Sequence, residues 1–136
     1  MAFTGPTEDR LLIRELYDSY ADAACRMDRA NWLACWTGDA VWWTHYFDVA
    51  GKAAIAATYD GLMANVATTS FFGQLGAVTV TGDTATVRSH ANERLIFKDG
   101  AGEHRLVGRY EDELRREGFT WRFARRTYIV LIEEQA

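Results

Sequence analysis

The sequence has few of the residues that mark several large classes of protein. Its 136 residues include one proline, two cysteines and three histidines. Cys25 and Cys35 are too widely spaced for a zinc knuckle, and we interpret both as reduced, small apolar side chains. Lys and Arg, 15 in all against 19 Asp and Glu, form no basic stripe. The sequence therefore predicts no disulfide framework, no metal site and no nucleic-acid partner.

Long apolar runs are missing as well. No segment approaches the roughly 18 consecutive apolar residues of a membrane span, and the start MAFTGPTEDR lacks the charged-then-apolar order of a signal peptide. There is no glycine-rich phosphate loop, Walker sequence or strained serine elbow, so the sequence implies no cofactor. We expect a soluble, cytoplasmic protein that does not bind a membrane.

The apolar residues that are present suffice for one core. Hydrophobic residues make up 49% of the chain and aromatic residues 13%, which predicts a single domain over residues 1–136. Apolar spacing and turn signals predict helices over 7–28, 31–36 and 52–66, a strand over 40–47, and two hairpins over 71–97 and 102–132. Helices followed by long antiparallel strands indicate an α+β fold.

This order of elements carries a resemblance to a known family. With the segments IRELYDSY, WLACWTGDAVW, TGDTATV and GRYEDELRREGFTWRFARR, the chain resembles the SnoaL-like family of the nuclear transport factor 2-like superfamily. The resemblance implies a cone-shaped, curved antiparallel sheet packed on three N-terminal helices, with an apolar cavity and a homodimer formed through the outer face of the sheet. The chain is also similar to the small subunits of ring-hydroxylating dioxygenases, which mainly serve assembly.

The acid that the resemblance leads us to expect is missing. In dehydratase-like members the first helix carries a tyrosine and, five positions on, an acid that faces the cavity. Here Tyr20 is followed at that spacing by Cys25. On a helical wheel Asp22 lies opposite the apolar stripe. Asp28 lies on the flank of the stripe and is expected either at the cavity mouth or simply in a turn.

The histidine of those members is missing too. It usually follows the third helix, where this chain reads TTSFFGQLG, with Ser70, Phe71 or Phe72 at the site. His45 lies in the aromatic strand, where its side chain could face the pocket or point away from it. His104 is expected at the surface. The pair that would serve general-base elimination is therefore not predicted here.

A carboxyl group from the sheet is the candidate replacement. In the strand after the TGDT turn, alternate residues from Ala85 to Phe97 share the cavity face, which places Glu93 inside and His90 outside. A carboxylate among apolar neighbours should have a raised pKa and exchange a proton near neutrality. The alternative is that Glu93 forms a salt bridge with an arginine such as Arg125.

The predicted site is an aromatic cavity, with plain core packing as the alternative. The expected catalytic groups are Tyr20, which would donate to an oxyanion, Glu93 as acid or base, and His45 in reserve. The expected substrate-binding residues are Cys25, Asp28, Trp43, Phe71, Phe72 and Tyr110.

Two functions are consistent with this site. The first is a small enzyme or binder that acts without a cofactor on a hydrophobic aromatic or polycyclic molecule, by dehydration, isomerisation or cyclisation. The second is a non-catalytic accessory subunit with a filled cone, similar to the dioxygenase small subunits.

Overall fold

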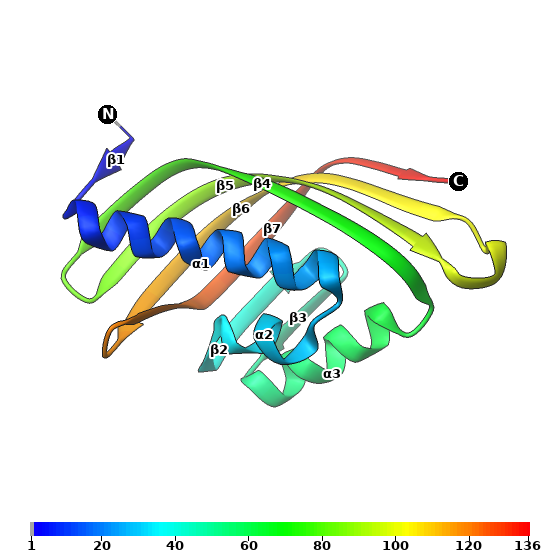
Figure 1. The fold of residues 1–136 in the computed structure, drawn as a ribbon, viewed down its shortest axis with the longest axis horizontal. Helices are drawn as coiled ribbons and strands as arrows, with labels where there is room; N and C mark the ends of the chain where they lie inside the picture. The colour runs from blue at the N-terminus through cyan, green and yellow to red at the C-terminus, as the bar shows by residue number, and fades with distance from the viewer. Residues whose placement is uncertain (1) are drawn as a thin grey trace.

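Three helices pack on one curved sheet in the computed structural model, which describes residues 2–136 (Figure 1). The helices are α1 (Thr7–Arg26), α2 (Arg29–Ala34) and α3 (Lys52–Met63), with a short 3₁₀ turn η1 (Lys98–Gly100). The strands are β1 (Phe3–Thr4), β2 (Trp36–Thr44), β3 (Phe47–Ala50), β4 (Val66–Thr81), β5 (Thr84–Phe97), β6 (Glu103–Glu117) and β7 (Thr120–Gln135). The predicted α+β class is confirmed.

The seven strands form one open sheet in the order β1-β4-β5-β6-β7-β2-β3. Neighbours from β4 to β7 are antiparallel, as the two predicted hairpins require. However, β2 runs parallel to β7 and β1 runs parallel to β4. The sheet is therefore mixed rather than wholly antiparallel. Helix α3 carries the chain from the β2–β3 edge to the far side of the sheet, and the last strand, β7, then returns to lie beside β2.

Helix α1 lies across the concave face of the sheet (Figure 1). It begins after Pro6 with Glu8 and Asp9 in its first turn, where acidic side chains complement the helix dipole. It ends at Met27, whose left-handed backbone (φ 54°, ψ 38°) closes the last turn. Residues spaced three or four apart turn one face to the sheet, and the buried apolar ones are Ile13, Leu16, Tyr20 and Ala23.

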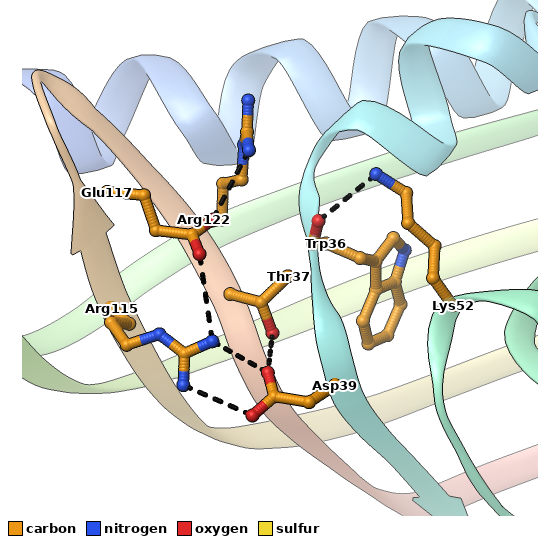
Figure 2. Close-up of polar contacts among 7 residues, drawn as sticks. All are labelled: Trp36, Thr37, Asp39, Lys52, Arg115, Glu117 and Arg122. Carbon is orange, nitrogen blue, oxygen red and sulfur yellow. Dashed lines mark hydrogen bonds and ion pairs between the residues drawn. The ribbon is translucent and has the colours of Figure 1, made fainter.

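Polar contacts fix the irregular start of β2 (Figure 2). After Trp36 the pairing of β2 with β7 shifts register. Within this shift Asp39 accepts hydrogen bonds from the Thr37 hydroxyl at 2.9 Å and from the Arg115 guanidinium at 2.6 Å. These bonds, the one from Arg115 first, lower the pKa of Asp39 to about 2. Lys52 donates to the Trp36 carbonyl at 3.3 Å, so β2 is attached to both β6 and α3.

Candidate functional site

A cavity of about 460 Å³ lies between the helices and the concave face of the sheet. This volume falls in the usual range of small-molecule sites. Its lining is mostly apolar and aromatic, with few polar groups. The lining residues are Tyr20, Ala24, Trp32, Trp42, Thr44, Tyr46, Phe47, Tyr59, Leu62, Met63, Thr69, Phe71, Glu93, Leu95, Phe97, His104, Leu106, Tyr110 and Tyr128.

The pairing of β5, β6 and β7 shows how Glu93, His104 and Glu133 are arranged on the sheet. Glu93 on β5 pairs with Leu106 on β6, which in turn pairs with Glu133 on β7. Two residues along β6, His104 pairs with Leu95. Paired residues of antiparallel strands share a face, and diagonal neighbours lie about 7–8 Å apart. Glu93 and His104 are therefore diagonal neighbours on the cavity wall.

Glu93 has no charged partner in the cavity. No hydrogen bond or ion pair joins its carboxyl group to another residue in the part of the chain that the structure describes. Burial raises its pKa to about 7. A carboxyl group in this state can either donate or accept a proton near neutral pH.

Three tyrosines, Tyr20, Tyr110 and Tyr128, line the cavity together with Glu93. Burial raises the pKa of Tyr20 to about 12, and burial also raises the pKa of Tyr110 and Tyr128. The charge of Glu93 contributes to all three shifts in the same direction. The phenols therefore stay protonated and remain hydrogen-bond donors. The Tyr128 hydroxyl is buried without a partner in residues 2–136.

A buried ion pair occupies the end of the sheet beyond these tyrosines. Arg126 donates to Asp112 from Nε at 3.1 Å and from Nη2 at 2.9 Å, and both residues are almost fully buried. Tyr17 donates a further hydrogen bond to Asp112. The guanidinium carbon lies 3.7 Å from the centre of the Tyr110 ring and 4.1 Å from that of Phe123. We call this end, defined by Asp112 and Arg126, the closed end.

The expected alternative of a salt bridge between Glu93 and Arg125 is wrong. Simple alternation from Phe123 would place Arg125 on the inner face. However, β7 holds one extra residue at this point relative to β6, and the shift reverses the alternation. Arg125 is exposed, and Arg126 faces inward. The sequence period alone does not reveal such a bulge.

The position expected for Cys25 also needs correction. The residue does not contribute to the cavity lining given above. Its sulfur accepts a hydrogen bond from the backbone N–H of Phe71 at 3.1 Å and donates to the Phe71 carbonyl at 3.4 Å. The thiol turns to β4 because the backbone there offers both a donor and an acceptor. Cys25 thus attaches the last turn of α1 to β4.

Two other predicted residues lie outside the cavity. Asp28 caps α2: its carboxylate accepts from the backbone N–H of Asn31 at 3.2 Å and from the Asn31 amide at 2.7 Å. These bonds, the backbone one first, lower its pKa, so Asp28 is a turn residue. His45 is exposed in the turn between β2 and β3. Its ring packs at a tilt against Tyr46, with 3.9 Å between the ring centres, and His45 does not line the cavity.

Adjacent aromatic residues divide between the two faces of the sheet. Phe71 lines the cavity, whereas Phe72 is 71% exposed on the outer face. Likewise Trp42 lines the cavity, whereas the expected Trp43 does not. Tyr110 lies on the wall, as predicted.

His104, which was expected at the surface, is on the cavity wall instead. Its Nε2 lies 2.8 Å from Oε1 of Glu133, and the Tyr46 hydroxyl donates to the same oxygen. Counting back from Tyr110 in steps of two, through Gly108 and Leu106, would have placed His104 inside. The end of the wall at His104 is called the open end below, because Tyr46 there is half exposed.

The described residues contain no cluster of three His, Cys, Asp or Glu side chains that could hold a metal ion. None of the helices in residues 2–136 combines the length and the apolar character needed to cross a membrane. The fold and site define a class of small α+β proteins in which helices and a curved sheet enclose an apolar cavity with a carboxyl group on its wall. The chain belongs to the SnoaL-like domain family, which matches residues 6–127.

Solved structures support the fold over nearly the whole chain. A proposed aromatic ring hydroxylase from Novosphingobium aromaticivorans is 30% identical, with a TM-score of 0.86 over 98% of this chain and 96% of that one. A proposed scytalone dehydratase from the same species is 18% identical, with a TM-score of 0.86 over 94% and 87% of the two chains. A type 2 hexachlorocyclohexane dehydrochlorinase is 16% identical, with a TM-score of 0.82 over 94% and 88%. No curated protein sequence matches the chain.

Proposed function

We propose that the protein is an enzyme that carries out proton transfer without a cofactor on a hydrophobic aromatic or polycyclic small molecule. The observation that carries the proposal is Glu93, an unpaired carboxyl group whose pKa is raised to about 7, on the wall of an aromatic cavity. The names of two of the similar structures, a dehydratase and a dehydrochlorinase, denote eliminations and support a lyase-like reaction.

In the proposed reaction the Glu93 carboxylate takes a proton from a carbon next to a substrate carbonyl. The C–H electron pair moves toward the carbonyl and forms an enolate, whose oxygen accepts a hydrogen bond from the Tyr20 hydroxyl. If the enolate takes the proton back at another carbon, the result is isomerisation. If it expels a neighbouring hydroxide, Glu93 protonates the hydroxide to water, and the result is dehydration.

The other lining groups would hold the substrate. Trp42, Phe71 and Tyr110 provide faces and edges for a planar ring. Tyr128 offers a second donor, because its hydroxyl is not otherwise engaged among the described residues. Cys25 and Asp28 would not contact the substrate; Cys25 would hold the end of α1 on β4, and Asp28 would cap α2.

A base-promoted ring opening tests the proton-transfer group before the substrate is known. In 5-nitrobenzisoxazole a base removes the ring C–H proton, the N–O bond breaks, and a coloured cyanonitrophenolate forms. We expect the protein to accelerate this reaction, with a rate that rises with pH around a midpoint of about 7. Glu93→Gln should lower the rate roughly 10²-fold or more.

The matched control is Glu113→Gln, since Glu113 is an exposed carboxylate on the same sheet. It should leave the rate unchanged. A Glu93→Gln protein that is folded and as active as the wild type would refute the role of Glu93.

An accessory subunit remains the second candidate, favoured by the 30% identity to a proposed aromatic ring hydroxylase. Copurification with a large iron-containing partner, together with no binding of aromatic ligands in the cavity, would support it. The enzyme is favoured because the side chains of the cone leave a cavity of about 460 Å³.

We also propose a homodimer formed through the outer face of the sheet. Phe72 and Ile132 are 71% and 50% exposed. Burying such side chains is the main driving force for association.

A further inference from the structure

The open end of the cavity holds a second titratable side chain, His104. His104 lines the wall beside Leu95 and diagonally from Glu93. Its side chain is only 17% exposed. The reaction proposed above uses Glu93 and Tyr20 and leaves this imidazole without a role.

The contacts of Glu133 define the orientation of the imidazole. One oxygen of Glu133 accepts the Tyr46 hydroxyl and lies 2.8 Å from Nε2 of His104. Because Oε1 of Glu133 already accepts a hydrogen bond from Tyr46, it meets the imidazole as an acceptor, and we assign the ring proton to Nε2 on this ground. Burial lowers the pKa of His104, which keeps the ring neutral at neutral pH. Nδ1 is then unprotonated.

The free imidazole nitrogen is a hydrogen-bond acceptor at the open end of the wall. The indole of Trp42 only donates, whereas the tyrosine hydroxyls and the Glu93 carboxyl group can also accept hydrogen bonds elsewhere on the wall. Nδ1 of His104 has no hydrogen-bond partner within residues 2–136. It is a good acceptor, and a ligand can satisfy it only by donating an O–H or N–H group.

We propose that His104, oriented by Glu133, is a specificity-determining residue that accepts a hydrogen bond from a hydroxyl group on the substrate at the open end of the cavity. This proposal rests on the proposed function, since it assumes that the cavity binds a planar aromatic molecule. It adds that the molecule carries a donor on its outer edge, two residues of strand away from Glu93. Glu133 and Tyr46 are positioning residues, which act only through the imidazole.

A purely structural role for the same contacts makes a different prediction. In that case His104, Glu133 and Tyr46 would join β6, β7 and the β2–β3 turn, and their loss would lower stability alone. The affinity for a ligand with a hydroxyl group would then match the affinity for the same ligand without one. The comparison of two such ligands separates the two roles.

The test uses 2-naphthol and 2-methoxynaphthalene, which share a ring system but differ in the O–H donor. Binding is followed at neutral pH by quenching of tryptophan fluorescence, since Trp32 and Trp42 line the cavity. The wild type should bind 2-naphthol more tightly, by roughly three- to tenfold, the range of one net hydrogen bond. His104→Phe should abolish the preference, whereas His90→Phe, on the outer face, should retain it.

Glu133→Gln provides a second variant in case His104→Phe does not fold. An amide at this position can donate to Nε2 and so favour the other tautomer, with Nδ1 protonated, which should also reduce the preference. Equal binding of the two ligands by the wild type would overturn the role of His104 while leaving the proposed function intact. Binding of neither ligand would overturn the proposed ligand class and this inference with it. An unchanged preference in folded His104→Phe would overturn the inference alone.

Discussion

Arg126 and Asp112 form a two-contact ion pair inside the core, with N–O distances of 3.1 and 2.9 Å. The pair lies on the same face of the sheet as Glu93 but at the closed end, behind Tyr110. Asp112 therefore neutralises the buried charge of Arg126, and the pKa of Glu93 is raised by burial.

Breaking this ion pair should be costly for folding. In Asp112→Asn the Arg126 charge stays buried without a counter-charge, and we expect a loss of about 3–5 kcal/mol in the free energy of unfolding. The double variant Asp112→Leu/Arg126→Met should lose less, because it leaves no charge behind. Urea unfolding of the three proteins measures both changes. A double variant less stable than the single variant would contradict this account.

The raised pKa of Glu93 makes stability depend on pH with a defined sign. The folded protein holds this proton up to about pH 7, whereas the unfolded chain releases it near the ordinary value of 4.5. The stabilisation is complete below pH 4.5 and is lost as the pH rises through 7, at most about 3 kcal/mol. Urea unfolding between pH 4 and 8 should show that Glu93→Gln lacks this component. Parallel pH curves for the two proteins would show that Glu93 is not buried.

Cys25 should tolerate serine better than aspartate. A serine hydroxyl can keep both contacts with the Phe71 backbone, so Cys25→Ser should change stability by about 1 kcal/mol or less. Cys25→Asp would place a carboxylate against the Phe71 carbonyl and should destabilise the fold by roughly 2 kcal/mol or more. Thermal unfolding measures both. Ring-opening activity should survive in Cys25→Ser, and its loss there would identify the thiol as a reacting group.

Gly108 should control the shape of the cavity. A Cβ atom at this position would overlap the far end of the Tyr128 ring. Gly108→Ala should therefore push this ring into the cavity, weaken binding of 2-methoxynaphthalene and cost roughly 1–3 kcal/mol of stability. Gly61→Ala is the matched control, because a Cβ there meets open space. Unaltered binding by Gly108→Ala would mean that Tyr128 does not shape the site.

The proposed dimer can be tested on the outer face. Phe72→Glu places a charge where we propose that two sheets meet, and it should give a monomer in sedimentation velocity. Thr86, on the neighbouring strand β5, is exposed as well. Whether Thr86→Glu also gives a monomer shows if the interface extends to β5. A monomeric wild type would exclude the dimer.

Periodic signals gave the correct positions of some residues and not of others. The alternation of β5 is unbroken around Glu93, so a two-residue period places it on the cavity wall. In β7 an extra residue reverses the alternation, and the inward position of Arg126 could not be derived without the pairing with β6. The parallel pairing of β2 with β7 joins segments that lie far apart in the sequence, such as Trp36 and Phe123. The hydrogen bonds of Cys25 with Phe71 likewise depend on tertiary contact alone.

The arrangement of the closed end restricts how the site could be redesigned. Arg126 is enclosed by Asp112 and a set of aromatic rings, so a larger ligand cannot be accommodated there without exposing a buried charge. At the opposite end Leu62 and Tyr46 are each about half exposed and can be replaced at little cost to folding. Libraries that aim at new substrates should therefore vary the positions around Leu62 and Tyr46 and leave the ion pair intact.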